Sequence, residues 1–163
     1  MFIQMTGDLK HVSPAAMAQR MRIQGKASTG SCLDGSWGFD FHGDIRPDGT
    51  SREAVVQKYR YSGFWGTNLD MLLRSNGVKT LVMSGVATSG CVESTTRDGF
   101  FNDYYVVTAG DCCADYDRAR HDASLRKMDL SFGYVVPGER ITGAWQGAKG
   151  VATATPAKAA RAG

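Results

Sequence analysis

The sequence predicts an α/β protein, a three-layer α/β/α sandwich around a mainly parallel, doubly wound sheet. From residue 54 onward, short apolar runs alternate with amphipathic stretches of helical period, the order that gives parallel strands covered by helices. The chain has 163 residues, of which 42% are hydrophobic and 21% charged, a composition typical of one globular core and not of a disordered chain.

Signals for export or membrane insertion are not found in the sequence. No apolar run approaches the roughly 20 residues of a membrane-spanning helix. The N-terminus also lacks the basic and then apolar layout of a signal peptide. We therefore expect a soluble, cytoplasmic protein that has no membrane partner.

The first third of the chain contains few regular elements. Phe2–Met5 is predicted to be a strand, and Pro14–Arg22 a short helix. Residues 25–51 are rich in Gly, Ser and Asp, which favours a long loop.

A strand and a helix follow this loop. Ala54–Val56 begins a β-branched run that ends at Lys58. Thr67 is suited to cap a helix, because Asp70 follows three residues later and the leucines after it fall on one face, and Gly77 ends the pattern.

The second half of the domain continues the alternation. Strands are predicted over Val78–Ser84, Tyr104–Ala109 and Phe132–Val136, and helices over Cys91–Asn102 and Asp117–Lys127. The glycine-bracketed turn GVATSG joins the first of these strands to the first of these helices.

The net charge of +3 is concentrated near the C-terminus. Residues 137–163 contain four basic residues against Glu139, so residues 1–136 are balanced. No basic stripe with interleaved aromatic residues is present, and we expect no nucleic-acid partner. The pattern predicts a domain over residues 1–136 and a basic, Ala/Gly-rich, mobile tail over 137–163.

The four cysteines do not form a pattern for disulfides or zinc. A chain of this length does not need disulfides for stability, and no export signal supplies an oxidising compartment. Cys112 and Cys113 are adjacent, and adjacent cysteines rarely both ligate one tetrahedral ion. We expect no metal and no other cofactor.

Cys91 is the candidate nucleophile by position alone. It follows a strand and a tight turn and lies in the first turn of a predicted helix, where unpaired amides and the helix dipole favour a thiolate and can bind an oxyanion. An ordinary buried cysteine is the alternative interpretation.

Cys91 and Arg97 also satisfy C-x5-R, the spacing of phosphatase loops that surround a phosphate. A phosphatase is therefore a remote alternative. The carboxylate of Glu93 and the helical distance between Cys91 and Arg97 both disfavour a phosphate site there.

Two longer stretches carry a family resemblance. KYRYSGFWGTNLD, from Lys58 to Asp70, and GVATSGCVESTTRDGFF, from Gly85 to Phe101, resemble the isochorismatase-like cysteine hydrolases. Within that family they are most similar to the ureidoacrylate, biuret and N-carbamoylsarcosine amidohydrolases. The resemblance covers about residues 2–136 and implies a hydrolase of linear C–N bonds, with an amide or ureide substrate and an acyl-enzyme intermediate.

The resemblance also implies roles for individual residues. The family has an Asp, Lys, Cys triad, which places the nucleophile at Cys91 and the lysine at Lys58. It further implies a cis peptide bond between Val86 and Ala87, with the amides of Ala87 and Cys91 forming the oxyanion hole. We expect the Cys91 sulfur to lie within about 4 to 6 Å of the Lys58 ammonium.

Other residues are candidates for the substrate pocket. Phe64, Trp65 and Thr88 are the positions that we expect there, although core packing equally explains Phe64 and Trp65. The family's dimers and tetramers also imply a homo-oligomer.

The triad's Asp has no match in this sequence. In the family it ends a strand upstream of the one matched by Phe2–Met5, and this chain begins after that point. Two interpretations follow: either the start is assigned too late, or the chain is a truncated, non-catalytic paralogue or binding subunit. Without that carboxylate we expect at most trace hydrolysis.

Overall fold

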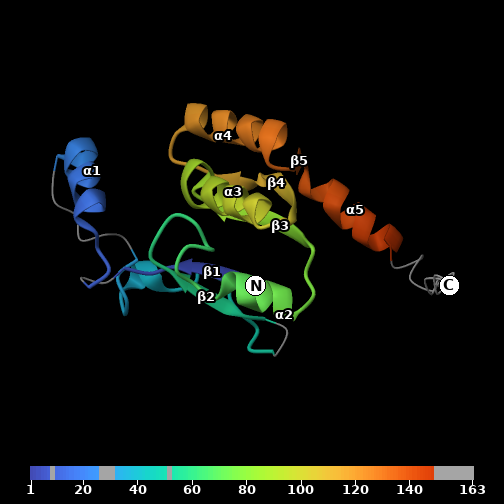
Figure 1. Ribbon diagram of the computed structural model, residues 1–163, viewed down its shortest axis with the longest axis horizontal. Coiled ribbons are helices and arrows are strands. Elements are labelled where there is room, and N and C mark those ends of the chain that lie inside the picture. Colours follow the sequence, from blue (N-terminus) through green and yellow to red (C-terminus); the bar gives the residue numbers. More distant parts are fainter. Residues whose placement is uncertain (8–9, 26–31, 51–52, 149–163) are drawn as a thin grey trace, which may run out of the picture.

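The computed structural model describes residues 1–7, 10–25, 32–50 and 53–148, and these form an α/β protein with parallel strands (Figure 1). The predicted class is confirmed. The strands lie in two sheets, one of order β1-β2 and one of order β3-β4-β5. Every strand pair is parallel.

The smaller sheet consists of β1 (Phe2–Met5) and β2 (Val55–Lys58). Phe2 pairs with Val55 and Met5 with Lys58, so both strands end at the same edge. In β2 the exposure alternates, and Val56 and Lys58 point to the buried side. The end of β2 therefore directs a lysine side chain into the interior.

The larger sheet consists of β3 (Thr80–Val86), β4 (Tyr105–Ala114) and β5 (Tyr134–Val136). β4 continues beyond the predicted end at Ala109, because a β-bulge shifts the register and lets its last residues pair with the end of β3. Such an extension depends on the partner strand and not on the local sequence.

Two helices precede β3. α1 (Pro14–Gln24) is confirmed and stands away from both sheets (Figure 1). The loop after it contains the short 3-10 helix η1 (Trp37–Phe39). α2 (Leu69–Ser75) begins two residues after Thr67, whose hydroxyl accepts a hydrogen bond from the Leu69 amide at 3.1 Å. 

The turn before α3 forms one π-helical turn, η2 (Thr88–Val92), which leads directly into α3 (Glu93–Phe101). Both lie within the region predicted as one helix and its preceding turn. At Gly99 the helix approaches the sheet closely: an added Cβ would lie 2.9 Å from the Leu81 side chain. A larger residue there would push α3 away from β3.

The C-terminal part of the fold contains more helix than the sequence predicts. α4 (Arg118–Ser131) begins after Asp117, whose carboxylate accepts the Arg120 amide at 2.8 Å. α5 (Gly138–Ala148) occupies the start of the stretch predicted as a mobile tail, and that prediction is wrong for these residues. α5 packs on β4, a tertiary contact that the sequence pattern does not reveal. The remainder of the predicted tail lies outside the described residues.

The main core joins α2 to both sheets. Its buried residues are Val56, Leu69, Leu73, Leu81, Tyr104 and Val106. Because the cluster contains residues from β2 and from the β3–β4 pair, it holds the two sheets in one body. Within the described residues, no helix is long and apolar enough to cross a membrane.

Tyr104 has a polar group at the edge of this core. Its side chain is buried, and its hydroxyl donates to Asp70 at 2.8 Å. Burial raises the pKa of Tyr104, and the carboxylate raises it further. The pKa of Asp70 is lowered by hydrogen bonds from Arg74 and then Tyr104. The hydroxyl thus links the residue just before β4 to α2.

We expect Tyr104→Phe to lower the free energy of unfolding by about 1 kcal/mol, because the hydrogen bond to Asp70 is lost while the ring remains packed. Urea denaturation measures the change. Tyr105→Phe is the matched control, since the neighbouring Tyr105 is 74% exposed. Equal effects of the two substitutions would contradict a role for the buried hydroxyl.

Candidate active site

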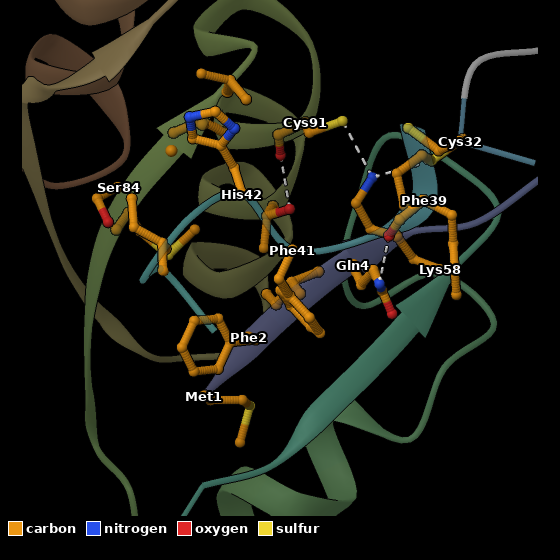
Figure 2. Close-up of a pocket in the computed structure, with 18 of the residues that line it drawn as sticks. Met1, Phe2, Gln4, Cys32, Phe39, Phe41, His42, Lys58, Ser84 and Cys91 are labelled. Carbon is orange, nitrogen blue, oxygen red and sulfur yellow. Dashed lines mark hydrogen bonds between the residues drawn. The ribbon is translucent and has the colours of Figure 1, made fainter. Parts of the chain in front are cut away.

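Lys58 and Cys91 come together between the two sheets (Figure 2). The Lys58 ammonium donates to the Cys91 sulfur at 3.0 Å and to the Arg60 carbonyl at 2.8 Å. It also lies 3.5 Å from the Met5 sulfur. Lys58 is only 2% exposed. An ammonium at this distance attracts a thiolate more strongly than a neutral thiol, so the pair is suited to nucleophilic chemistry.

Cys91 lies in the turn that follows β3. The peptide bond between Val86 and Ala87 is cis, and η2 then carries Cys91 into α3. The carbonyl of Ala87 accepts the amides of Gly90 and Val92 at 3.1 and 3.2 Å. These bonds hold the turn that presents the half-buried cysteine.

Thr95 connects this turn to the segment after β2. Its hydroxyl donates to the Cys91 carbonyl at 2.7 Å and accepts the Gly63 amide at 2.9 Å. Because Thr95 is buried, solvent competes little for either bond. The helix carrying the sulfur is thereby tied to the strand end carrying the ammonium.

Asp115, just after β4, and His121, in α4, contact the opposite side of the turn. The Ser89 amide donates to Asp115 at 2.6 Å. Burial acts to raise the pKa of Asp115, but hydrogen bonds from Ser89 and from the following amides outweigh it and hold that pKa below its ordinary value. His121 Nδ1 lies 2.9 Å from the hydroxyl of the fully buried Thr88. His121 is half-buried, with one ring nitrogen against this hydroxyl.

A cavity of about 520 Å³ opens beside Cys91 and Lys58. It is lined by β1 and β3 and by part of the loop predicted over 25–51, including Cys32, Phe41 and His42 (Figure 2). The sequence predicted a long loop in this region but did not identify these side chains as pocket residues. Only their aromatic and polar character within a Gly-rich loop could have indicated them.

The predicted pocket residues lie elsewhere. Phe64 packs with the core, its ring centroid 5.9 Å from that of Tyr104. Trp65 is 67% exposed, and Thr88 faces His121. None of the three predicted residues lines the cavity that contains Cys91. Phe64 and Trp65 follow β2, whereas Thr88 begins η2 after β3.

Arg97 does not approach the cysteine as a phosphate ligand would. Its guanidinium pairs with Glu93 one helical turn earlier and lies 4.5 Å from the centroid of the Phe132 ring. The phosphatase alternative is therefore wrong, because the arginine is held on the outer face of α3 by these partners.

The family described as "Isochorismatase domain" matches residues 2–140, which is most of the chain. The chain belongs to the isochorismatase family.

Curated relatives in the isochorismatase family include ureidoacrylate amidohydrolases. RutB of Acinetobacter baylyi is 39% identical over 120 residues, 73% of this chain and 46% of the relative. RutB of Methylobacterium radiotolerans is 38% identical over 144 residues, 88% of this chain and 54% of the relative. The chain thus spans about half the length of these curated relatives.

Solved structures show the same isochorismatase fold. An isochorismatase-like hydrolase from Alkaliphilus metalliredigens has a TM-score of 0.69 at 32% identity, over 88% of this chain and 69% of the other. N-carbamoylsarcosine amidase from Thermoplasma acidophilum has a TM-score of 0.64 at 28% identity, over 83% and 69%.

We expect iodoacetamide at neutral pH to alkylate Cys91 faster than Cys112, although Cys112 is exposed. Partial desolvation of the thiol and the nearby Asp111 carboxylate raise the pKa of Cys112. The Lys58 ammonium, in contrast, attracts the Cys91 thiolate. Lys58→Met should slow labelling at Cys91 about 10-fold. Peptide mapping by mass spectrometry gives the rate at each cysteine. Lys79→Met, a change at an exposed lysine, is the control, and equal slowing by both variants would refute the assignment.

The bond between Asp115 and the Ser89 amide should make stability depend on pH. Because the pKa of Asp115 is lowered in the folded protein, its contribution is present above the unfolded pKa of about 3.9 and is lost as pH falls through the folded value. Asp115→Asn should therefore destabilise the protein at pH 7, with a smaller difference from wild type near pH 3. Urea titrations at both pH values test this. An equal loss of unfolding free energy at the two pH values would contradict this prediction. So would the same loss in Asp44→Asn, the control at an exposed site.

Proposed function

We propose that this isochorismatase-family protein hydrolyses linear C–N bonds of amide, ureide or carbamoyl compounds. The observation that carries the proposal is the 3.0 Å contact between the Lys58 ammonium and the Cys91 sulfur at the edge of a cavity. The names of the relatives, ureidoacrylate amidohydrolase and N-carbamoylsarcosine amidase, support the class of bond.

The first half of the reaction forms a thioester. The Cys91 thiolate attacks the substrate carbonyl, a C–S bond forms, and the charge on oxygen is stabilised by the amides of Ala87 and Cys91. The tetrahedral species then collapses, the C–N bond breaks, and the nitrogen leaves with a proton from a general acid. Lys58 stabilises the thiolate before it attacks.

The second half regenerates the enzyme. Water passes a proton to the base that the first half left behind and attacks the thioester carbonyl, the C–S bond breaks to restore the Cys91 thiolate, and the acid product leaves. The cavity volume of about 520 Å³ is ample for a small amide or ureide together with this water.

A non-catalytic binding protein is the second candidate. It is favoured by the surroundings of Lys58: among the described residues no carboxylate lies within salt-bridge distance of its ammonium. Among the described residues, no carboxylate beside Lys58 is therefore placed to act as the general acid for the leaving nitrogen. Such a protein would keep the cavity and bind the same compounds without turnover.

The decisive assay is ammonia release from ureidoacrylate, biuret and N-carbamoylsarcosine. We expect slow release that is abolished by Cys91→Ala and reduced about 100-fold by Lys58→Met, because the nucleophile is removed or loses its cation. Cys112→Ala is the matched control, since that exposed cysteine lies outside the cavity. Ammonia release that persists in Cys91→Ala would refute the proposal. Binding without release in every form would favour the second candidate.

A further inference from the structure

The pair formed by Lys58 and Cys91 holds a primary amine and a thiol within reacting distance of each other. The Lys58 nitrogen lies 3.0 Å from the Cys91 sulfur, and Figure 2 shows the two side chains pointing toward one another. Groups held about 3 to 3.5 Å apart react far faster than the same groups free in solution, because no encounter is needed. Once the sulfur becomes electrophilic, a nucleophilic nitrogen is therefore already in place beside it.

The Lys58 side chain has little freedom to leave this position. It is 2% exposed, and its ammonium donates to the Arg60 carbonyl at 2.8 Å and lies 3.5 Å from the Met5 sulfur. Its backbone is fixed as well, because Lys58 ends β2 and its carbonyl accepts the Thr6 amide at 2.9 Å. The nitrogen is thus held against the Cys91 sulfur from both ends of the side chain.

The Cys91 sulfur, in contrast, is open to small molecules. The residue is half-buried and lines the cavity of about 520 Å³. Hydrogen peroxide is only slightly larger than water and fits this volume easily. Peroxides oxidise the thiolate, which is the form that the neighbouring ammonium favours. The first product is a sulfenic acid, whose sulfur is electrophilic.

A second thiol lines the same cavity. A sulfenic acid at Cys91 could condense with the thiol of Cys32 to a disulfide. The carbonyl of Cys32, however, accepts the Gly7 amide at 2.9 Å, which ties its backbone to the segment after β1. The Lys58 nitrogen already contacts the Cys91 sulfur directly. The geometry therefore favours condensation with the amine over a disulfide.

We propose that Lys58 and Cys91 form a reversible sulfenamide, a direct S–N bond, when hydrogen peroxide oxidises the thiol. The modification needs neither substrate nor turnover, so it is independent of the proposed hydrolysis. While the bond exists, Cys91 has no free thiolate and is protected from further oxidation to the sulfinic and sulfonic acids, which ordinary thiols do not reduce.

The reaction balances with one molecule of hydrogen peroxide. The Cys91 thiolate attacks a peroxide oxygen, the O–O bond breaks, and the released hydroxide takes a proton from the Lys58 ammonium to form water. The neutral amine then attacks the sulfur, the S–N bond forms, the S–O bond breaks, and hydroxide leaves with a second nitrogen proton as another water. The sulfur loses two electrons and the peroxide gains them. A dithiol reverses the step, because one thiol releases the amine and the other resolves the mixed disulfide.

Peptide mapping of the full chain tests the linkage. The protein is treated with hydrogen peroxide, free thiols are blocked with N-ethylmaleimide, and trypsin digestion follows without reductant. We expect loss of cleavage after Lys58 and a linked pair, residues 53–60 joined to residues 80–97, lighter by two hydrogen atoms than the two separate peptides. Dithiothreitol should restore both peptides.

Lys58→Arg separates the amine from its charge, because a guanidinium keeps the cation but is a poor nucleophile. This variant should give no linked pair. Compared at equal loss of Cys91 thiol, its share of sulfinic acid should be about 10-fold that of the wild type. Lys79→Arg, the same change at an exposed lysine, should behave as the wild type does.

The remaining outcomes are distinguished by mass. Cys32→Ser should leave the linked pair unchanged. A disulfide between Cys32 and Cys91 in the wild type would overturn the proposal. So would a linked mass heavier by one oxygen atom, which excludes a direct S–N bond, or sulfinic acid at Cys91 with cleavage after Lys58 intact.

Discussion

The contact between the Lys58 ammonium and the Cys91 sulfur is the interaction on which the candidate site depends. It joins the end of β2 to the turn after β3, and these strands belong to sheets that share no ladder among the described residues. A buried ammonium is tolerated only where polar or polarisable atoms surround it. The sulfur therefore has a structural role, because it solvates the buried cation.

The supporting contacts reach the cysteine turn from two sides. Thr95 ties it to the segment after β2, and Asp115 holds the amide of Ser89 from the end of β4. Thr95 lines the cavity and Asp115 does not, yet both restrict where the sulfur lies. Precise placement of this kind is what allows a nucleophile to be near its substrate before any reaction occurs.

Much of the fold could be predicted from local patterns. The strand at Phe2–Met5 and a helix that starts near Asp117 were both predicted from local sequence. The far end of β4 could not be predicted, because it depends on a β-bulge in the pairing with β3. The helix α5 could not be predicted either, because packing on β4 supports it. Residues such as Phe64 were ambiguous, since an aromatic ring suits a core and a pocket equally.

By itself, the sequence determined the α/β class, the parallel strands and the family resemblance, and it selected Lys58 and Cys91 as the pair to consider. Only the tertiary structure decided that their side chains touch, which residues line the cavity and where Arg97 points. The physical reason is distance along the chain. Periodicity and capping act over a few residues, whereas Lys58 and Cys91 are separated by 33 positions and meet only because two sheets pack around one core.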